Sequence, residues 1–554
     1  MKRFITAIVL LSICLSLSAV SSLRIFELDH PVYDEMETLF VLEGKSSPMG
    51  SKPWTETDVQ HLLARISPDS ELSQNLKSRI EGYISEKDNG LIFNAVINPQ
   101  LMVHSNKDSF NKVDDVAASS LLDDQAATIG LGYYYKNNIA MYMDASLGVA
   151  PADAGDDASK RLSSAFGSNI PFLPDSLNIM NFPYNAYFNA GSEALRLFIG
   201  RGQVEWGNGA MGNMMLGNTL PYHDYLSLTF TGSRHFSYQL LTSFFSHSAN
   251  KKDESDREIM RGLRFFLGHR FEFAFFNDKL TFAVNDGIMY QAENGYFDLR
   301  LLNPLFFMHN GFMAYHSNSL LTLEAEYSPI KNLSIYAQLG IDDLAVAGEP
   351  KPGESGGSAN GVGAMAGLRW TVPVSEKSYG YGNAEFVYTS PYMYHRALKD
   401  DGGTNDLYYV SSNRFMNNGL KFVERYLSFP FGSDAIVCQV QAGYNAPGLY
   451  DIKAKASFMA HGVMDKNSTI RQYKDGEKVV HAPSTSNPLA VSGNEDKGGV
   501  IEYTLRTGVE AEYRPVAYLP INAGIYLITV WNKGNYSVPV SFDVQFNLGF
   551  KLIH

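Results

Sequence analysis

Hydrophobic and polar residues alternate strictly over the last fifteen positions of the chain. One face of this stretch consists of Val540, Phe542, Val544, Phe546, Leu548, Phe550 and Leu552. The other face consists of Ser541, Asp543, Gln545, Asn547, Gly549 and Lys551. A period of two is the period of a β-strand. A strand with one apolar and one polar face predicts a wall between hydrocarbon and water, as in a transmembrane β-barrel.

The same alternation returns in segment after segment from about residue 91 onward. Residues 139–147, 321–327 and 501–513 each place apolar side chains on one face and polar ones on the other. Carboxylates such as Glu324 and Glu510 lie on the polar faces, and a dry core would not tolerate them. We count roughly sixteen to eighteen strands, the size at which barrels begin to hold an aqueous lumen. The predicted fold is all-β, a large transmembrane antiparallel barrel. A soluble β-sandwich or propeller is the alternative.

Residues 51–87 follow helical spacing instead. Thr55, with Asp58 three positions later, resembles a capping box, and a second helix start is expected at 67–69. Apolar residues recur at helical intervals after each start. We expect two short amphipathic helices outside the barrel wall, on the periplasmic side. Residues 23–90 are therefore predicted to be a periplasmic helical region and a candidate plug, and residues 91–554 the barrel.

The N-terminus has the layout of a secretory signal peptide. Lys2 and Arg3 precede an apolar run that is too short and too interrupted to span a bilayer, and small residues follow it. We expect residues 1–22 to be cleaved and the protein to be exported to the outer membrane. Lipidation of Cys14 is the alternative, but Ile13 stands where lipoprotein signals usually have a small residue.

Short turns alternate with long polar connections along the barrel region. Turns such as 136–138 and 446–448 contrast with long segments at 150–184, 247–260, 348–361 and 461–499. Outer-membrane barrels have short periplasmic turns and long outward loops. The long segments are therefore the expected place of contact with a ligand or partner.

Composition agrees with a barrel and narrows the function. Aromatic residues make up 13% of the chain, charged residues only 19%, and there are 47 glycines. The formal net charge is -13, and loss of Lys2 and Arg3 with the signal leaves -15. Without a basic stripe, nucleic acid is not an expected partner. Removal of Cys14 would leave Cys438 alone, so no intrachain disulfide is expected.

Several motifs resemble chemical sites but lack the required context. Residues 207–212 match G-x-G-x-x-G, yet no helix or suitably spaced acidic residue follows. Residues 353–357 match G-x-S-x-G within a Gly-rich loop and not at a strand-to-helix turn. Asp342 and Asp343 are adjacent on a strand, where side chains point to opposite faces. We predict no catalytic residue, no metal and no cofactor.

Three stretches resemble the Wzi-like capsule assembly family of outer-membrane barrels. The first runs from Gly200 to Asp224 and includes the Trp206-Gly207-Asn208-Gly209 turn; the others are 302–343 and 429–435. The resemblance assigns structural roles to Gly200, Arg201, Trp206, Gly207, Gly209, Asp342, Asp343 and Asp434. The helices before the barrel also look like the periplasmic plug of that family. The segments 348–361 and 461–499 have no counterpart there, and the chain ends in Ile553-His554 where barrels usually have an aromatic residue.

The resemblance implies a monomeric, lectin-like barrel that holds surface polysaccharide, capsular or related, and that contacts outer-membrane lipid. Such binding requires aromatic faces that stack on sugar rings. The candidates in the expected outward loops are Phe172, Tyr184, Tyr187, Tyr392, Tyr394, Tyr408 and Tyr409. For each of them, packing in a girdle or loop is the alternative role. A general diffusion porin is the alternative function, and an outer-membrane enzyme a third one.

Overall fold

The computed structural model describes most of the chain outside the longest connections. The described residues are 22–85, 89–106, 125–136, 138–148, 166–170, 185–245, 263–292, 297–308, 317–344, 360–396, 407–408, 410–416, 420–465, 468, 488–492 and 497–553. The predicted signal peptide 1–22 lies almost entirely outside these residues, and its cleavage stays a prediction.

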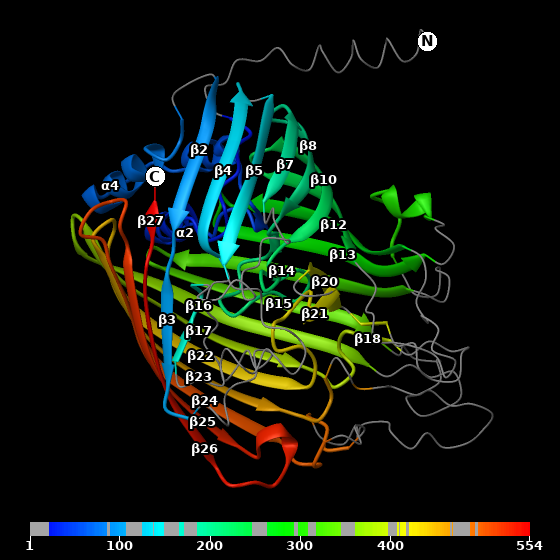
Figure 1. The fold of residues 1–554 in the computed structure, drawn as a ribbon. Helices are drawn as coiled ribbons and strands as arrows, with labels where there is room; N and C mark the ends of the chain where they lie inside the picture. Colours follow the sequence, from blue (N-terminus) through cyan, green and yellow to red (C-terminus); the bar gives the residue numbers. More distant parts are fainter. Residues whose placement is uncertain are drawn as a thin grey trace.

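The wall is a closed antiparallel β-barrel (Figure 1). Its first part contains β2 (Asn89–Ile97), β3 (Gln100–His104), β4 (Gln125–Tyr135), β5 (Ile139–Gly148), β6 (Phe166–Ser168), β7 (Ala186–Gly191), β8 (Leu195–Gly202), β10 (His223–Ser233) and β11 (Phe236–Phe245). It continues with β12 (Leu263–Phe275), β13 (Leu280–Ala292), β14 (Ser317–Ile330), β15 (Leu333–Asp343), β16 (Gly361–Ser375) and β17 (Ser378–Thr389). It ends with β22 (Ala435–Ala446), β23 (Tyr450–His461), β24 (Glu502–Tyr513), β25 (Ile521–Trp531), β26 (Ser541–Phe550) and β27 (Leu552–Ile553).

The barrel closes where the first and last strands meet. The chain bends at 98–99, so that β2 pairs with β4 and β27, whereas β3 pairs with β26 and β6. Figure 1 shows the blue first strand beside the red last strand. If β2 with β3 and β26 with β27 are each counted as one strand, and three-residue β6 is left out, the described wall has eighteen strands. The prediction of a large antiparallel barrel is confirmed, and the sandwich and propeller are excluded.

The outer face of the wall is apolar because the predicted alternation holds in the structure. Phe542, Val544 and Phe546 on β26 are 58%, 43% and 41% exposed, whereas Asp543 and Gln545 between them are buried. On β5, Met141 and Met143 are exposed while Tyr142 and Asp144 are buried. Outward apolar side chains need hydrocarbon around them, which is the environment of a membrane-spanning wall.

The N-terminal segment 22–85 contains three helices and one short strand. These are α2 (Val32–Leu42), β1 (Ser51–Lys52), α3 (Glu56–Leu63) and α4 (Glu71–Glu81). The predicted capping box opens α3, since Thr55 and Asp58 bond each other's backbone N–H groups. The second predicted start is displaced: α4 is capped by Ser70. Helix α2 was not predicted. Among the described residues, no helix is long and apolar enough to cross a membrane.

This segment lies at the end of the barrel where the strands are joined by short turns. Lys331, in the turn between β14 and β15, contacts Glu43 and Asp69. Asn75 on α4 donates to the carbonyl of Glu376, in the turn between β16 and β17, at 2.8 Å. The long connections join the strands at the opposite end. There, the described residues form the small pairs β18 (His395–Arg396) with β19 (Leu407–Tyr408), and β20 (Val410–Met416) with β21 (Leu420–Tyr426).

Candidate functional site

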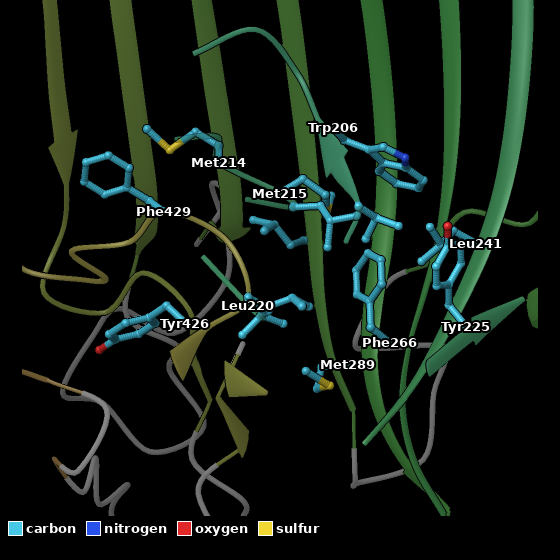
Figure 2. Close-up of a cluster of buried hydrophobic side chains, with 14 of the residues drawn as sticks. Trp206, Met214, Met215, Leu220, Tyr225, Leu241, Phe266, Met289, Tyr426 and Phe429 are labelled. Carbon is cyan, nitrogen blue, oxygen red and sulfur yellow. The ribbon is translucent and has the colours of Figure 1, made fainter. Parts of the chain in front are cut away.

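The connection between β8 and β10 turns into the lumen. We call residues 203–222 the inward segment. It contains β9 (Glu205–Trp206), which pairs with β1 of the N-terminal segment. Trp206 is fully buried and donates from Nε1 to Gln239 Oε1 on β11 at 2.6 Å. Figure 2 shows Trp206, Met214, Met215 and Leu220 of this segment among buried side chains that the strands and residues 426–429 contribute.

Polar side chains of the wall hold the loop at the tip of the inward segment. Glu385 on β17 accepts from the backbone N–H groups of Ala210 and Met211 at 2.7 and 2.9 Å. Gln338 on β15 accepts from the Met214 N–H at 2.9 Å and donates to Asn213 Oδ1 at 2.7 Å. Buried backbone groups need such partners, so the wall supplies the hydrogen bonds that the loop cannot make internally.

The N-terminal segment enters the lumen from the other end and uses the same kind of contact. Arg196 on β8 binds Asp58 at 2.7 Å. Glu272 on β12 accepts from the Gly50 N–H, and Glu326 on β14 accepts from the Ser47 N–H, both at 3.0 Å. The two segments meet where Gly207 donates to the Gly50 carbonyl at 2.9 Å. Together they form what we call the two-part plug, residues 22–85 and 203–222.

The plug changes the interpretation of the carboxylates on the lumen face. Their presence predicted a wet interior, because a dry core could not hold them. In the structure, Glu272, Glu326 and Glu385 are buried and bonded to plug backbone. Along β12 to β17, the lumen is therefore filled by protein, and the carboxylates serve as acceptors for it.

Among the described residues, two cavities lie on the opposite side of the lumen. The larger, about 370 Å³, lies between the N-terminal segment and the short-turn ends of β22 to β26. The smaller, about 150 Å³, lies farther along the same wall and is closed on its inner side by Met211 and Phe431. Glu510 and Tyr526 line both cavities. This wall carries Lys453, Lys455 and Arg506, so the residual lumen is polar and charged.

The three predicted sugar-stacking aromatics whose side chains are described are buried and form no accessible surface. Tyr187 packs against Phe198 inside the barrel, with ring centroids 5.5 Å apart. Tyr394 is fully buried and donates to the Met214 carbonyl at 3.0 Å, and Tyr392 is also buried. Assigning Tyr187 to an outward loop was wrong, because it lies on β7 and faces the interior. Tyr392 and Tyr394 lie in the outward connection after β17, but both are buried and therefore not accessible. Phe172, Tyr184 and Tyr409 lie outside the described residues, as does the side chain of Tyr408.

The residues of the family motif occupy structural positions. Gly200 and Gly207 have φ values of +156° and +110°, and a Cβ at either would lie within 2.3 Å of another atom. Arg201 forms a two-point ion pair with its cross-strand neighbour Asp224, at 2.6 and 2.9 Å. Gly209 donates to Asn213 Oδ1 at 2.9 Å. Asp342 is buried, and the side chain of Asp343 is not among the described ones.

Asp434 joins several outward connections. Its carboxylate accepts from the N–H groups of Met464 and Ala490 at 2.9 and 2.8 Å. Its own N–H donates to the Ser390 carbonyl, and its carbonyl accepts from Gly462. Burial raises the pKa of this carboxyl, while the two N–H donors oppose the rise. We call Asp434 with these four partners the Asp434 hub; it links two long connections, the one between β17 and β22 and the one between β23 and β24.

Sequence reasoning did not single out Asn213, Gln338 or Glu385, which anchor the inward segment. Their only signal was a place on the polar face of a strand or in a glycine-rich turn, which many residues share. The described residues hold no cluster of three or more side chains suited to a metal ion.

Comparison with known proteins supports the fold. No protein-family model and no curated protein matches the sequence. Among solved structures, the chain is similar to Wzi of Escherichia coli, an outer-membrane protein involved in group 1 capsule assembly and described as a carbohydrate-binding β-barrel. The identity is 12%, the alignment covers 95% of this chain and 99% of Wzi, and the TM-score is 0.58.

Two further solved structures align more loosely. The first is the outer-membrane protein opdK of Pseudomonas aeruginosa, with 12% identity, a TM-score of 0.39, and an alignment that covers 84% of this chain and 99% of opdK. The second is the outer-membrane channel DcaP of Acinetobacter baumannii, with 10% identity, a TM-score of 0.34, and an alignment that covers 85% of this chain and 99% of DcaP. At these TM-scores, neither structure supports an inference about this chain. With the apolar outer face, the closed wall and the alignment over 95% of its length, the chain has the fold of the Wzi outer-membrane β-barrel.

Proposed function

We propose that this protein is a non-enzymatic outer-membrane barrel that binds or anchors surface polysaccharide, capsular or related, on its outward side. The observation that carries the proposal is the two-part plug. A diffusion porin of this strand number keeps an aqueous lumen. Here two separate segments fill the lumen along β12 to β17 and bury their apolar side chains against each other and the wall.

Two further observations support binding at the outward end. The Asp434 hub ties the connection between β17 and β22 to residues 462–464 and 490 of the connection between β23 and β24. Loops that are already held in one arrangement lose less conformational entropy when a ligand binds, and this favours recognition. The similar fold belongs to a protein described as carbohydrate-binding. Export through a cleaved signal peptide and a monomeric state belong to the same proposal.

A diffusion channel is the second candidate function, and the two cavities along β22 to β26 favour it. The smaller cavity, about 150 Å³, is far narrower than a porin lumen and is bounded by the plug residues Met211 and Phe431. General passage of solutes would therefore require the plug to leave.

The test is direct binding of polysaccharide to the purified full-length protein in detergent micelles. The probe is surface polysaccharide extracted from the cells that express the protein, and the readout is biolayer interferometry. We expect saturable binding that Asp434→Asn weakens about tenfold, because loss of a buried hydrogen bond to a charged group is worth about that factor. Asn tolerates the φ of +58° at this position, so the backbone is preserved.

Glu512→Gln is the matched control, since it removes a carboxylate at the opposite end of the barrel. Its binding should equal that of the wild type. If the folded wild-type protein does not bind this polysaccharide saturably, the proposal is wrong.

A further inference from the structure

The two residual cavities follow one strand along most of the barrel wall. The smaller cavity is lined by Thr504, Arg506, Gly508 and Glu510, and the larger by Glu510, Glu512 and Arg514. Except for Arg514, which follows the strand, these are successive lumen-facing positions of β24. From 504 to 512 the strand is about 27 Å long, and at the usual tilt of about 40° it covers about 20 Å of the apolar band, which is about 25 Å tall in such barrels.

The cavities meet at a three-strand contact. Glu510 on β24 binds Lys453 and Lys455 of β23 at 3.3 and 3.0 Å. It also accepts from the Tyr526 hydroxyl of β25 at 2.9 Å. All three charged side chains of this contact keep 24–33% of their surface exposed. We call Lys453, Lys455, Glu510 and Tyr526 the Glu510 bridge. Glu510 and Tyr526 line both cavities, so the bridge stands where the two cavities adjoin.

The side of the smaller cavity that faces away from the barrel wall is apolar. Met211 of the inward segment and Phe431 face it. The described charged residues that line it are Lys455, Arg506 and Glu510, which leaves one net positive charge. Arg506 lies over the Tyr526 ring at 4.4 Å, so its charge is held beside the bridge. Selectivity in a pore is set where the lining charges are closest to the ion.

We propose that the plugged barrel retains a narrow ion-conducting passage along β24 that passes the Glu510 bridge and is selective for small inorganic anions. This activity goes beyond polysaccharide binding and does not depend on it. The smaller cavity has a volume of only about 150 Å³, so the passage is proposed for small ions and not for sugar chains. The plug residues form one side of it, so conduction occurs with the plug in place.

The first test is conductance of the purified full-length protein in a planar bilayer, with the reversal potential measured across a potassium chloride gradient. The wild type should show a small, steady current that favours chloride. Glu510→Gln should raise the chloride-to-potassium permeability ratio about 25-fold, because one unit charge at about 4 Å in water changes the occupancy of each ion about fivefold, in opposite directions. Lys455→Gln should shift the ratio toward potassium.

Glu71→Gln serves as the matched control, because it also removes one carboxylate but lies at the exposed start of α4 and lines neither cavity. It should leave the ratio unchanged. Heat-dependent mobility on denaturing gels verifies that each variant has folded. A silent wild type together with silent Glu510→Gln overturns the proposal, and so does a current whose selectivity neither bridge variant changes.

A second test locates the current. Ser457 on β23 lines the narrow cavity, and Cys438, the free cysteine of the described chain, is exposed. Ser457→Cys in a Cys438→Ser background should lose most of its current when a negatively charged methanethiosulfonate is added, and Cys438→Ser alone should not respond. An unaffected current would place conduction elsewhere and contradict the proposal. Polysaccharide binding, measured separately, is expected to be unchanged by all of these lumen variants, so the two proposals can fail independently.

Discussion

Gly207 turns the inward segment directly after the buried Trp206. Its φ of +110° is in the region that side chains other than glycine's rarely adopt, and a Cβ would lie 2.3 Å from Asn213 Oδ1 and 2.7 Å from Gln338 Nε2. Those two atoms bond to each other and hold the loop. The glycine therefore allows both the turn and the polar contact that the turn creates.

Gly207→Ala should reduce the free energy of unfolding by about 1–3 kcal/mol, the usual cost of a side chain forced into such a conformation. Urea titration of the protein folded in phospholipid vesicles measures it. Gly202→Ala is the matched control, because a Cβ there would meet only Asn185 Oδ1, at an ordinary 3.5 Å. Its effect should stay within about 0.5 kcal/mol. Equal effects of the two substitutions would contradict the strain argument.

At the scale of elements, α2 shows how the helices of the N-terminal segment are held together. Glu35 is 7% exposed at its side chain and binds Arg79 of α4 at 2.6 Å. Burial raises its pKa, and the ion pair with Arg79 only partly offsets this. A raised pKa in the docked state means that the docked helix binds a proton more readily than the free one. The stability from this group is fully present below the ordinary glutamate pKa and is lost as the pH rises through the raised value.

Docking of α2 should therefore be firmer in mildly acidic than in neutral solution. Hydrogen exchange of the α2 amides, corrected for the intrinsic effect of pH, should show greater protection in mild acid. Glu35→Gln, which cannot titrate, should reduce this pH dependence. Weaker protection of the wild type in mild acid would show that the ion pair outweighs the burial of Glu35.

At the scale of the whole molecule, the outer face must meet hydrocarbon. Leu527 lies near the middle of β25 and is 48% exposed, while its neighbour Tyr526 faces the lumen. Val516 lies in the turn between β24 and β25 and is 40% exposed. If the outer face were in water, an arginine would cost about the same at both positions, because their exposure is similar. In a membrane, Leu527 lies near the bilayer midplane and Val516 near its surface, so the cost differs.

Leu527→Arg should destabilise the barrel in phospholipid vesicles by about 2–4 kcal/mol, and Val516→Arg by about 0–1 kcal/mol. Reversible folding into vesicles, followed by tryptophan fluorescence against denaturant, gives both values. If the two variants were equally stable, the wall would not be in a bilayer at the depth that the strand pattern indicates.

The candidate site was far less predictable than the wall. Asp543 and Phe542 could be assigned to opposite faces because each strand residue points away from its neighbour, whatever the rest of the chain does. Tyr187 and Tyr394 could not be placed in this way. Their burial depends on Phe198 and Met214, which come from other parts of the sequence. An aromatic residue has the same local pattern whether it faces a sugar, lipid or another ring.

The sequence by itself determined the barrel, its approximate strand number and the start of α3, because period two and helix capping are local properties. Lipid outside the wall makes the period-two signal strong. Only the tertiary structure decided that residues 203–222 fold into the lumen, that Glu326 and Glu385 bond to the plug instead of water, and that a charged path remains along β24. A polar face shows that a residue needs a partner, but the partner is chosen by chain segments that meet only when the barrel closes.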